Sequence, residues 1–188
     1  HDNRNYWRKD IFSNYKSNRK KAREKSDMDW DKAYKMIHSL LEELEKELPY
    51  KHLEVEKTEA DDIIAVITKH NYVKEDILII SSDKDFQQLQ RYPNVKQYSP
   101  HKDEFMVCEN PEHFLIDHII RGDSSDGIPN ILSDDDAIIN KEKRQNSCRK
   151  NIVEDIFNNL DEWSKKDNWK RNQSLVDLNF IPEEYENK

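Results

Sequence analysis

The chain has 188 residues, of which 35% are hydrophobic and 37% charged, so it suits one domain, or one domain with a small appendage. No apolar run is long enough to span a membrane, and the two isolated cysteines lack the spacing of a disulfide framework or metal site, which predicts a reduced, cytoplasmic protein. The net charge of −8 argues against nucleic-acid binding only if the charge is evenly spread, and it is not.

The charge divides the chain into a basic arm and an acidic body. Residues 1–25 carry +6, whereas residues 26–188 carry −14. This pattern is expected of a phosphate-binding element beside a metal site, although a solvated basic helix without a ligand would look the same. The spacing predicts a basic helix over Tyr6–Lys25, whose aromatic residues would either stack on unpaired bases or pack on a neighbouring helix.

An α/β core is predicted after the arm. Apolar residues at helical spacing predict a helix over Trp30–Leu48 with Asp29 as N-cap, and the alternation around Leu53 and Val55 predicts a short strand. The alternation of helices and strands then predicts an α/β fold with a largely parallel central sheet flanked by helices. Its elements are a helix over Glu59–His70, strands over Ile77–Ser81, Val95–Tyr98 and Glu104–Val107, and a helix over Pro111–Arg121.

The last third of the chain shows only helical patterns. Residues 133–147 are polar and predict a mobile connection. The helices expected around it are Ile152–Leu160, Asp161–Trp169 and Arg171–Leu178.

The central strand leads directly into two carboxylates, Asp83 and Asp85. The continuous apolar run over Ile77–Ile80 predicts a strand buried on both faces, and such sheets bind ligands beyond the carboxyl ends of their strands. If the extended conformation persists, both carboxylates point the same way. Because they would repel each other, a divalent cation is the simplest reason for the arrangement.

Two further acidic clusters lie at the ends of predicted helices. TEADD (residues 58–62) begins one, and GDSSDG (residues 122–127) holds both glycines of the chain, which indicates a tight turn. Alone, the first would merely complement a helix dipole and the second would be an ordinary turn. Taken together, the three acidic clusters offer only oxygen ligands, and such ligands favour Mg²⁺ or Mn²⁺. The histidines show no ligand spacing and are assigned surface or packing roles; they include His38, His52, His70, His101, His113 and His118.

At these residues the sequence resembles the 5′-nuclease superfamily of flap endonucleases, most closely the ribonuclease H branch of T-even-type phages. The matching pieces span nearly the whole chain in the order of the family. They are DNRNYWRKD, YKSNRKKARE, TEADD, ILIISSDKDFQQL, YPNVKQYSP, GDSSDGIP and VDLNFIP.

The resemblance implies a structure-specific 5′-3′ exonuclease or flap endonuclease that removes RNA primers and 5′ flaps in DNA replication. Its implied partners are branched or flapped DNA, RNA–DNA hybrids, and a replication protein. It also implies two Mg²⁺ (or Mn²⁺) ions that activate a water molecule and stabilise the leaving oxygen. The implied ligands are Asp2, Asp61 and Asp83 for the first ion, and Glu59, Asp85, Asp123 and Asp126 for the second.

The basic arm matches the gateway that lies over the active site in this family. Asp2, Asp61 and Asp83 are the implied catalytic acids, with Lys16 and Arg19 as catalytic cations. The implied nucleic-acid contacts are Arg8, Tyr15, Lys16, Arg19, Lys20, Lys21 and Arg23, with Tyr15 stacking on the terminal base. The implied domains are the gateway (1–29), the nuclease core (30–126) and a helical DNA-binding portion (127–188).

The chain also departs from the family pattern. The first strand of the family, which carries a further metal-binding aspartate, has no counterpart here, and the C-terminal tail is short. The sheet is therefore expected to lack its central first strand. This is consistent with a natural fragment, with a separate N-terminal fragment that completes the site, or with an impaired enzyme. Two competing interpretations are a non-catalytic binder of branched DNA and a ribonuclease of the related PIN-type fold.

Overall fold

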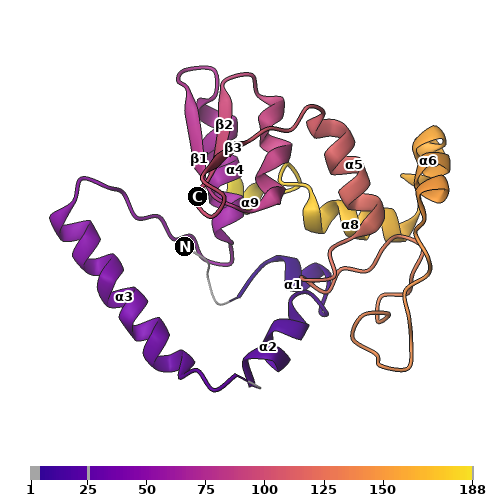
Figure 1. The fold of residues 1–188 in the computed structure, drawn as a ribbon, viewed down its shortest axis with the longest axis horizontal. Coiled ribbons are helices and arrows are strands. Elements are labelled where there is room, and N and C mark those ends of the chain that lie inside the picture. The colour runs from indigo at the N-terminus through magenta and orange to yellow at the C-terminus, as the bar shows by residue number, and fades with distance from the viewer. Residues whose placement is uncertain (1–4, 25, 188) are drawn as a thin grey trace.

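The computed structural model, which describes residues 5–24 and 26–187, contains a three-stranded mixed sheet in the upper part of the view in Figure 1. The strands β1 (Ile77–Ile80), β2 (Val95–Ser99) and β3 (Glu104–Met106) lie in the order β1-β2-β3. β1 pairs with β2 in parallel, whereas β3 returns antiparallel to β2. The α/β class agrees with the sequence analysis, but the described sheet is mixed rather than largely parallel.

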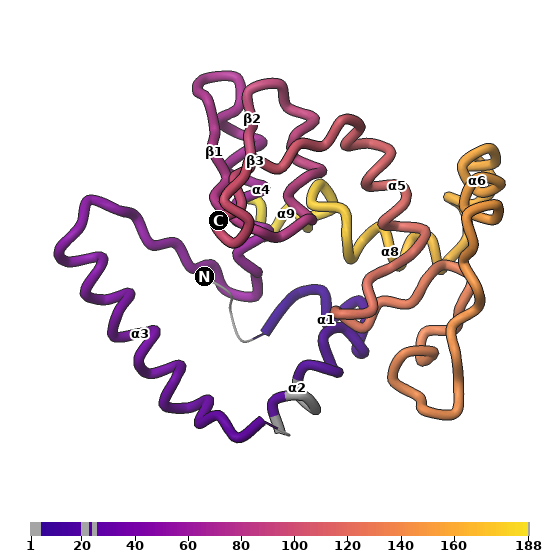
Figure 2. Tube along the Cα trace, in the orientation of Figure 1, coloured from indigo at the N-terminus to yellow at the C-terminus, as the bar shows by residue number. Residues whose placement is uncertain are grey.

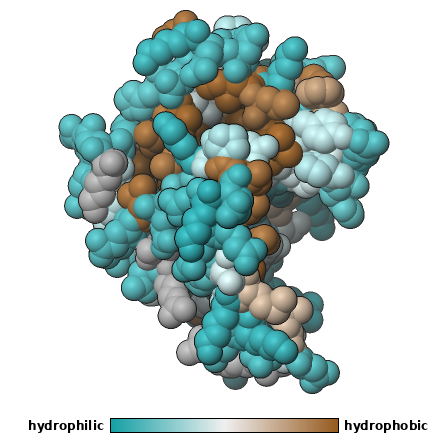
Figure 3. Space-filling view, turned by 90° about the vertical axis from the view of Figure 1, so that its left-hand side faces the viewer, coloured by the Kyte–Doolittle hydropathy of each residue, from teal (hydrophilic) through white to brown (hydrophobic). Residues whose placement is uncertain are grey.

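Only one face of β1 is buried, which corrects the prediction of a strand covered on both sides. Ile79 is 5% exposed and packs against α4 (Ala60–Asn71) and the 3₁₀ helix η1 (Lys84–Arg91). Leu78 and Ile80 point the other way and are 52% and 66% exposed. Nothing in the described part of the chain covers this second face. Figure 3 shows the side of the molecule from which α3 extends, where apolar side chains gather in the upper part.

The segment before α4 forms no strand, contrary to the prediction at Leu53 and Val55. Its apolar side chains instead line a cavity of about 170 Å³ together with residues of α4 and with Ile181 near the C-terminus.

The arm contains two short helices instead of the one predicted over Tyr6–Lys25. They are α1 (Arg8–Ile11) and α2 (Ser17–Glu24), and the chain turns between them at Lys16, whose φ is +54°. Phe12 and Tyr15 of this turn are buried in the core. The aromatic residues of the arm therefore pack inside the protein, which was one of the two interpretations of their spacing.

The helix α3 (Trp30–Glu47) begins where predicted, because the side chain of Asp29 caps it by accepting a hydrogen bond from the Lys32 N–H (3.0 Å). None of its residues is buried, and Figures 1 and 2 show it standing apart from the sheet. No residue of α3 belongs to either of the two apolar clusters that form the core of the described residues. No described helix is both long and apolar enough to cross a membrane.

Helices form the rest of the molecule. They are α5 (Pro111–Arg121), α6 (Lys150–Asn158), α7 (Leu160–Trp163), α8 (Asp167–Val176) and α9 (Glu183–Glu186). α5 and α8 pack together around a core that includes Ile120, Ile156 and Leu175. No helix or strand occurs in residues 133–147.

A buried glutamine joins the end of α8 to η1. The side chain of Gln88 donates to the Val176 carbonyl (3.0 Å) and accepts from the Leu178 N–H (2.9 Å). The helix η1, which follows β1, is thereby held next to the end of α8, and it also packs against α5. This places the carboxyl end of β1 beside the loop that follows α5.

Candidate metal and nucleic-acid site

The loop after α5 has a backbone shape that requires glycine. Gly122 ends the helix with φ +64°, and a Cβ atom there would lie only 2.4 Å from the Ile128 carbonyl oxygen. The Ile128 N–H donates to the Asp123 carbonyl (2.7 Å), which closes a narrow loop. The tight turn expected from the two glycines is therefore confirmed, and the loop carries Asp123 and Asp126.

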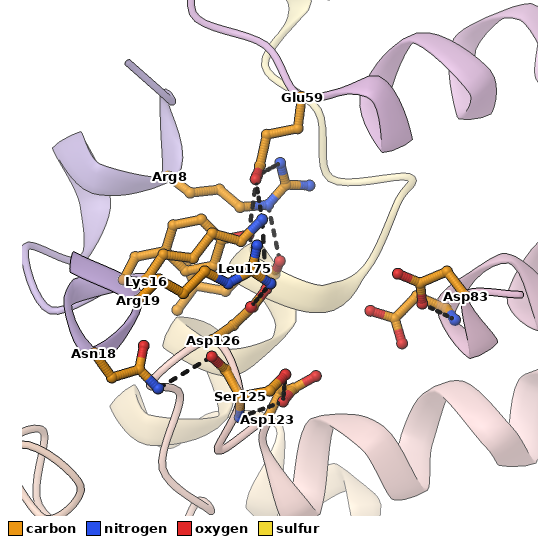
Figure 4. A network of polar contacts seen from close by, with 12 residues as sticks. Arg8, Lys16, Asn18, Arg19, Glu59, Asp83, Asp123, Ser125, Asp126 and Leu175 are labelled. Atoms are coloured by element: carbon orange, nitrogen blue, oxygen red, sulfur yellow. Dashed lines mark hydrogen bonds and ion pairs between the residues drawn. The ribbon is translucent and has the colours of Figure 1, made fainter. Parts of the chain in front are cut away.

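The arm docks on this loop. The Lys16 N–H donates to the Asp126 carbonyl (2.7 Å), and the Asn18 amide donates to the carbonyls of Ser124 and Ser125 (both 3.0 Å). A Cβ atom at Gly127 would lie 3.0 Å from the Asn14 carbonyl oxygen, so the two segments are in close contact. Figure 4 shows how this places the cations of the arm above the acidic loop.

A buried network links these cations to Glu59, the N-cap of α4. Glu59 accepts hydrogen bonds from Arg8 and from the Tyr15 hydroxyl (both 2.9 Å), and it forms an ion pair with Lys16. Burial alone would lower the pKa of Lys16, but the carboxylates of Glu59 and Asp126 outweigh it and raise that pKa. Both oxygens of Glu59 are thus engaged by side chains of the arm (Figure 4).

Two of the residues predicted to contact nucleic acid are buried and bind other side chains of the protein instead. Arg8 is 2% exposed and pairs with Asp62 (2.8 Å) as well as Glu59. Tyr15 is 4% exposed, and burial, together with Glu59, raises the pKa of its hydroxyl. The prediction that Tyr15 stacks on a terminal base is therefore wrong for this arrangement, because its ring is part of the core.

The other residues of the predicted gateway differ in accessibility. The side chain of Arg19 is 46% exposed and pairs with Asp126, and Arg23 donates to the Tyr34 hydroxyl (3.0 Å). Asp2 and the side chains of Lys20 and Lys21 lie outside the described residues.

Four of the acids predicted as ligands line one small polar cavity. Asp61 comes from the first turn of α4, Asp85 from η1, and Asp123 and Asp126 from the loop after α5. Carboxylates that are far apart in the sequence therefore meet, as expected. Arg8 and Tyr15 form part of the same wall.

Asp83 does not line this cavity, and its predicted alignment with Asp85 is wrong. Strand β1 ends at Ile80, and Asp83 instead caps η1, where its side chain accepts from the Asp85 N–H (3.0 Å). The alternation of side chains along an extended chain therefore does not apply to this pair. Figure 4 shows Asp83 on the opposite side of the site from Arg8 and Lys16.

A histidine that the sequence analysis assigned to a surface or packing role lies between two of the acids. His118 on α5 is 6% exposed; its Nδ1 lies 3.5 Å from Asp85 Oδ1 and its Nε2 lies 3.7 Å from Asp123 Oδ2. One ligand atom from each of the three residues can be chosen so that all lie within 4.8 Å of one another, and the described residues contain no other such group. Only the position of His118 in the last turn before the acidic loop could have suggested this role.

The two carboxylates beside His118 have opposite electrostatic environments. Burial, together with the nearby charges of Asp83 and Asp123, raises the pKa of Asp85 to about 6, against the effect of His118. His118 and hydrogen bonds from Ser125 hold the pKa of Asp123 below its usual range. Asp85 Oδ1 and both ring nitrogens of His118 are buried without a hydrogen-bond partner. A divalent cation could bind Asp85 Oδ1 and one of the two ring nitrogens together with an oxygen of Asp123, so the residues fit a metal site.

The profile of the 5′-3′ exonuclease N-terminal resolvase-like domain matches residues 1–115, more than half of the chain. The chain belongs to the 5′-3′ exonuclease family. This family member is 36% identical to ribonuclease H of Enterobacteria phage T4 over 95% of the chain and 62% of that relative. It is 32% identical to the flap endonuclease Xni of Shewanella piezotolerans over 66% of the chain and 49% of that relative. It thus spans less than two thirds of the length of either relative.

Solved structures show the same fold. The T5 D15 protein, co-crystallised with metal ions, matches this structure with a TM-score of 0.67 at 19% sequence identity. The match covers 94% of this chain and 73% of the T5 protein. A complex of the T5 D15 flap endonuclease with DNA and metal ions has the same TM-score at 18% identity, with 97% of this chain and 77% of that chain covered. The exonuclease-family chain therefore has the resolvase-like 5′-nuclease fold.

Proposed function

We propose that the chain is a metal-dependent, structure-specific 5′-nuclease that hydrolyses phosphodiester bonds near the 5′ ends of flaps and RNA primers. The observation that carries this proposal is the meeting of Asp61, Asp85, Asp123 and Asp126 around one cavity, directly beside the cations Lys16 and Arg19. Acids that hold metal ions and cations that hold phosphate are the two parts that such a reaction needs. Membership of the exonuclease family supports the same activity.

The carboxylates of the cavity are the proposed metal ligands, with Asp83 and Asp2 completing the set. Mg²⁺ retains several of its water molecules, so an acid at the margin of the cavity, such as Asp83, can bind through water. When bound, two Mg²⁺ or Mn²⁺ ions would activate the attacking water and stabilise the leaving oxygen. We assign Glu59 a different role: it holds Arg8 and Lys16 in place, because both of its oxygens accept hydrogen bonds from the arm.

The cations of the arm are the proposed contacts to the substrate. Lys16 lies 3.6 Å from Asp126 at the cavity, and the half-exposed Arg19 extends the positive charge outward. Lys20, Lys21 and Arg23 would add contacts to the backbone phosphates that do not depend on base sequence. The proposed substrates are flapped DNA and RNA–DNA hybrids, with a replication protein as a further partner, in the cytoplasm of the host cell if a phage encodes the chain.

Cleavage assays test this proposal. The protein is incubated with a 5′-flap duplex and with an RNA–DNA hybrid, each with Mg²⁺ and with a chelator. We expect cleavage that requires metal and falls at least about 100-fold in Asp123→Asn, since the metal ions supply most of the charge stabilisation. The matched control Asp161→Asn changes an exposed acid of α7 outside the cavity and should cleave normally.

Two other results would point elsewhere. Binding of the flap without cleavage, even at high metal concentration, would favour a non-catalytic binder of branched DNA. Cleavage that persists in Asp123→Asn or in the chelator would overturn the metal-dependent mechanism.

A further inference from the structure

The imidazole of His118 is in an unusual position for a packing residue. It is 94% buried between two carboxylates, and neither ring nitrogen has a hydrogen-bond partner in the described part of the chain. The separations of 3.5 Å to Asp85 and 3.7 Å to Asp123 are longer than N–H···O hydrogen bonds. Buried polar atoms without partners are destabilising, so native proteins rarely keep them without a function.

A neutral imidazole cannot donate hydrogen bonds to both of the carboxylates that flank it. A neutral ring carries one N–H group and one lone pair, whereas ionised carboxylates only accept. If the ring is neutral and both acids are ionised, at least one of the two carboxylates therefore faces a lone pair of the ring. A cation placed among the three side chains would accept electron pairs from all of them and remove this repulsion.

The distances suit ligands of one ion. Divalent ions of the relevant size bind nitrogen and oxygen at about 2.1 Å, so two ligands of one ion lie no more than about 4.2 Å apart. An ion binds only one ring nitrogen, and each nitrogen lies within this limit of the acid that it faces. One nitrogen of His118 and one oxygen of each acid lie within 4.8 Å of one another, so a small adjustment of the side chains brings all three around one ion. Asp123 is also oriented for the purpose, because its Oδ1 accepts from the Ser125 N–H (2.8 Å) and hydroxyl (2.6 Å), which leaves Oδ2 on the side of His118.

We propose that His118 is a metal ligand, and that Asp85, His118 and Asp123 form a mixed nitrogen–oxygen site. Imidazole is a better ligand for transition ions such as Mn²⁺ than for Mg²⁺, which prefers oxygen. One metal position of this chain therefore binds Mn²⁺ selectively over Mg²⁺. The inference rests on the proposed metal-dependent function because it uses two of the same acids.

Electron paramagnetic resonance of bound Mn²⁺ tests the ligand directly. Pulsed spectra of the full chain should show coupling of the manganese to a ¹⁴N nucleus, and this coupling should disappear in His118→Gln while Mn²⁺ remains bound. The matched control His113→Gln changes an exposed histidine of the same helix and should keep the coupling. A merely structural role of His118 would leave no nitrogen signal to lose.

Competition between ions tests the selectivity. The Mg²⁺ concentration that displaces half of the bound Mn²⁺ should fall about 10-fold in His118→Gln relative to the parent protein. His118→Asn provides a smaller substitution if the first variant does not fold, as judged by circular dichroism. Protein labelled with ¹⁵N-histidine, which needs no substitution, should convert the ¹⁴N coupling into a ¹⁵N coupling.

The results separate this inference from the proposed function. Mn²⁺ bound without nitrogen coupling, or coupling that persists in both His118 variants, would overturn the inference even if the chain cleaves DNA. Failure to cleave any substrate, with the coupling present and dependent on His118, would overturn the nuclease proposal and leave the mixed site standing.

Discussion

Asp85 is a carboxylate whose ionised form is disfavoured by the fold. Burial, with the nearby charges of Asp83 and Asp123, raises its pKa to about 6 from the ordinary 3.8. Between these two values the folded state binds more protons than the unfolded state, so stability rises as the pH falls through 6 toward 4. Above pH 6, the ionised side chain lowers the free energy of unfolding of the metal-free protein.

Asp85→Asn is therefore expected to stabilise the metal-free protein at pH 7.5. A pKa unit corresponds to about 1.4 kcal/mol, so removing the charge should add about 3 kcal/mol and raise the Tm by roughly 9 °C in EDTA. The gain should shrink to nearly zero by about pH 4, where Asp85 of the parent protein is protonated. Thermal unfolding followed by circular dichroism measures both effects.

Asp123→Asn serves as the opposite control. His118 and Ser125 favour the ionised form of Asp123, so the same chemical change should lower the Tm at pH 7.5 in EDTA. A shift of the Tm in the same direction in both variants would contradict the claim that the fold disfavours the ionised form of Asp85 and favours that of Asp123.

The meeting of the acids could be predicted from the sequence, whereas the partners that neutralise them could not. Asp61, Asp85 and Asp123 lie near the ends of helices or strands, and hydrophobic periodicity predicts where these ends fall. In an α/β fold the carboxyl ends of the strands and the loops that follow them lie at one edge of the sheet. The position of His118 depends on how α5 packs against η1, which no spacing in the sequence encodes. The burial of Arg8 likewise depends on the tertiary fold rather than on its charged neighbours in the arm.

The predicted elements were accurate where hydrophobic periodicity determines them. α4, α5 and the three strands lie within a few residues of the expected ranges, because one face of each is apolar. The single helix expected over the arm was wrong, because docking of Lys16 on the acidic loop turns the backbone at that point. A contact between segments 110 residues apart in the sequence thus overrides a local helical preference.

The loop that joins α5 to the rest of the chain depends on Gly122. Alanine at this position would have an unfavourable positive φ, and its Cβ would lie 2.4 Å from the Ile128 carbonyl oxygen. We expect Gly122→Ala to lower the free energy of unfolding by about 3 kcal/mol, because this strain adds to the displacement of the loop. Urea denaturation measures the loss.

Gly127→Ala tests a milder clash in the same loop. Gly127 also has a positive φ (+77°), but the nearest atom to its Cβ would be the Asn14 carbonyl oxygen at 3.0 Å rather than 2.4 Å, so the loss of stability should be smaller. The effect should instead be a looser arm, visible as faster proteolysis after the basic residues of α2. Equal losses of stability in the two variants would contradict the role given to Gly122.

Across the whole molecule, the positive arm lies against a negative body, and this arrangement makes DNA affinity depend on salt. Each phosphate contact contributes about −0.9 to the slope of log affinity against log salt concentration. Removing one such contact with Arg19→Ala should reduce the steepness of the slope by about 1 and weaken binding of a 5′-flap duplex more at 50 mM than at 200 mM salt. Fluorescence anisotropy with a chelator present measures binding without cleavage.

Lys170→Ala is the matched control for the arm. Lys170 is an exposed cation of α8, and its removal changes the net charge by the same amount. An identical slope for Arg19→Ala and Lys170→Ala would show that net charge, rather than the arm, governs binding.

The uncovered face of β1 determines how the whole molecule behaves in concentrated solution. Leu78 and Ile80 are more than half exposed on a strand that pairs with β2 alone among the described residues. An exposed apolar strand at the edge of a sheet is a template for pairing with another chain. We therefore expect the 188-residue chain to self-associate as its concentration rises.

Lysine at these two positions should suppress the association. In the double variant Leu78→Lys/Ile80→Lys, two charges replace apolar groups that lie outside the core, so stability should change little while the monomer fraction rises. Size-exclusion chromatography with light scattering measures that fraction over a concentration series. Leu40→Lys places a charge on the exposed apolar face of α3 and provides the comparison. If Leu40→Lys restores the monomer and the double variant does not, the chains associate through α3, and the open face of β1 is not the contact.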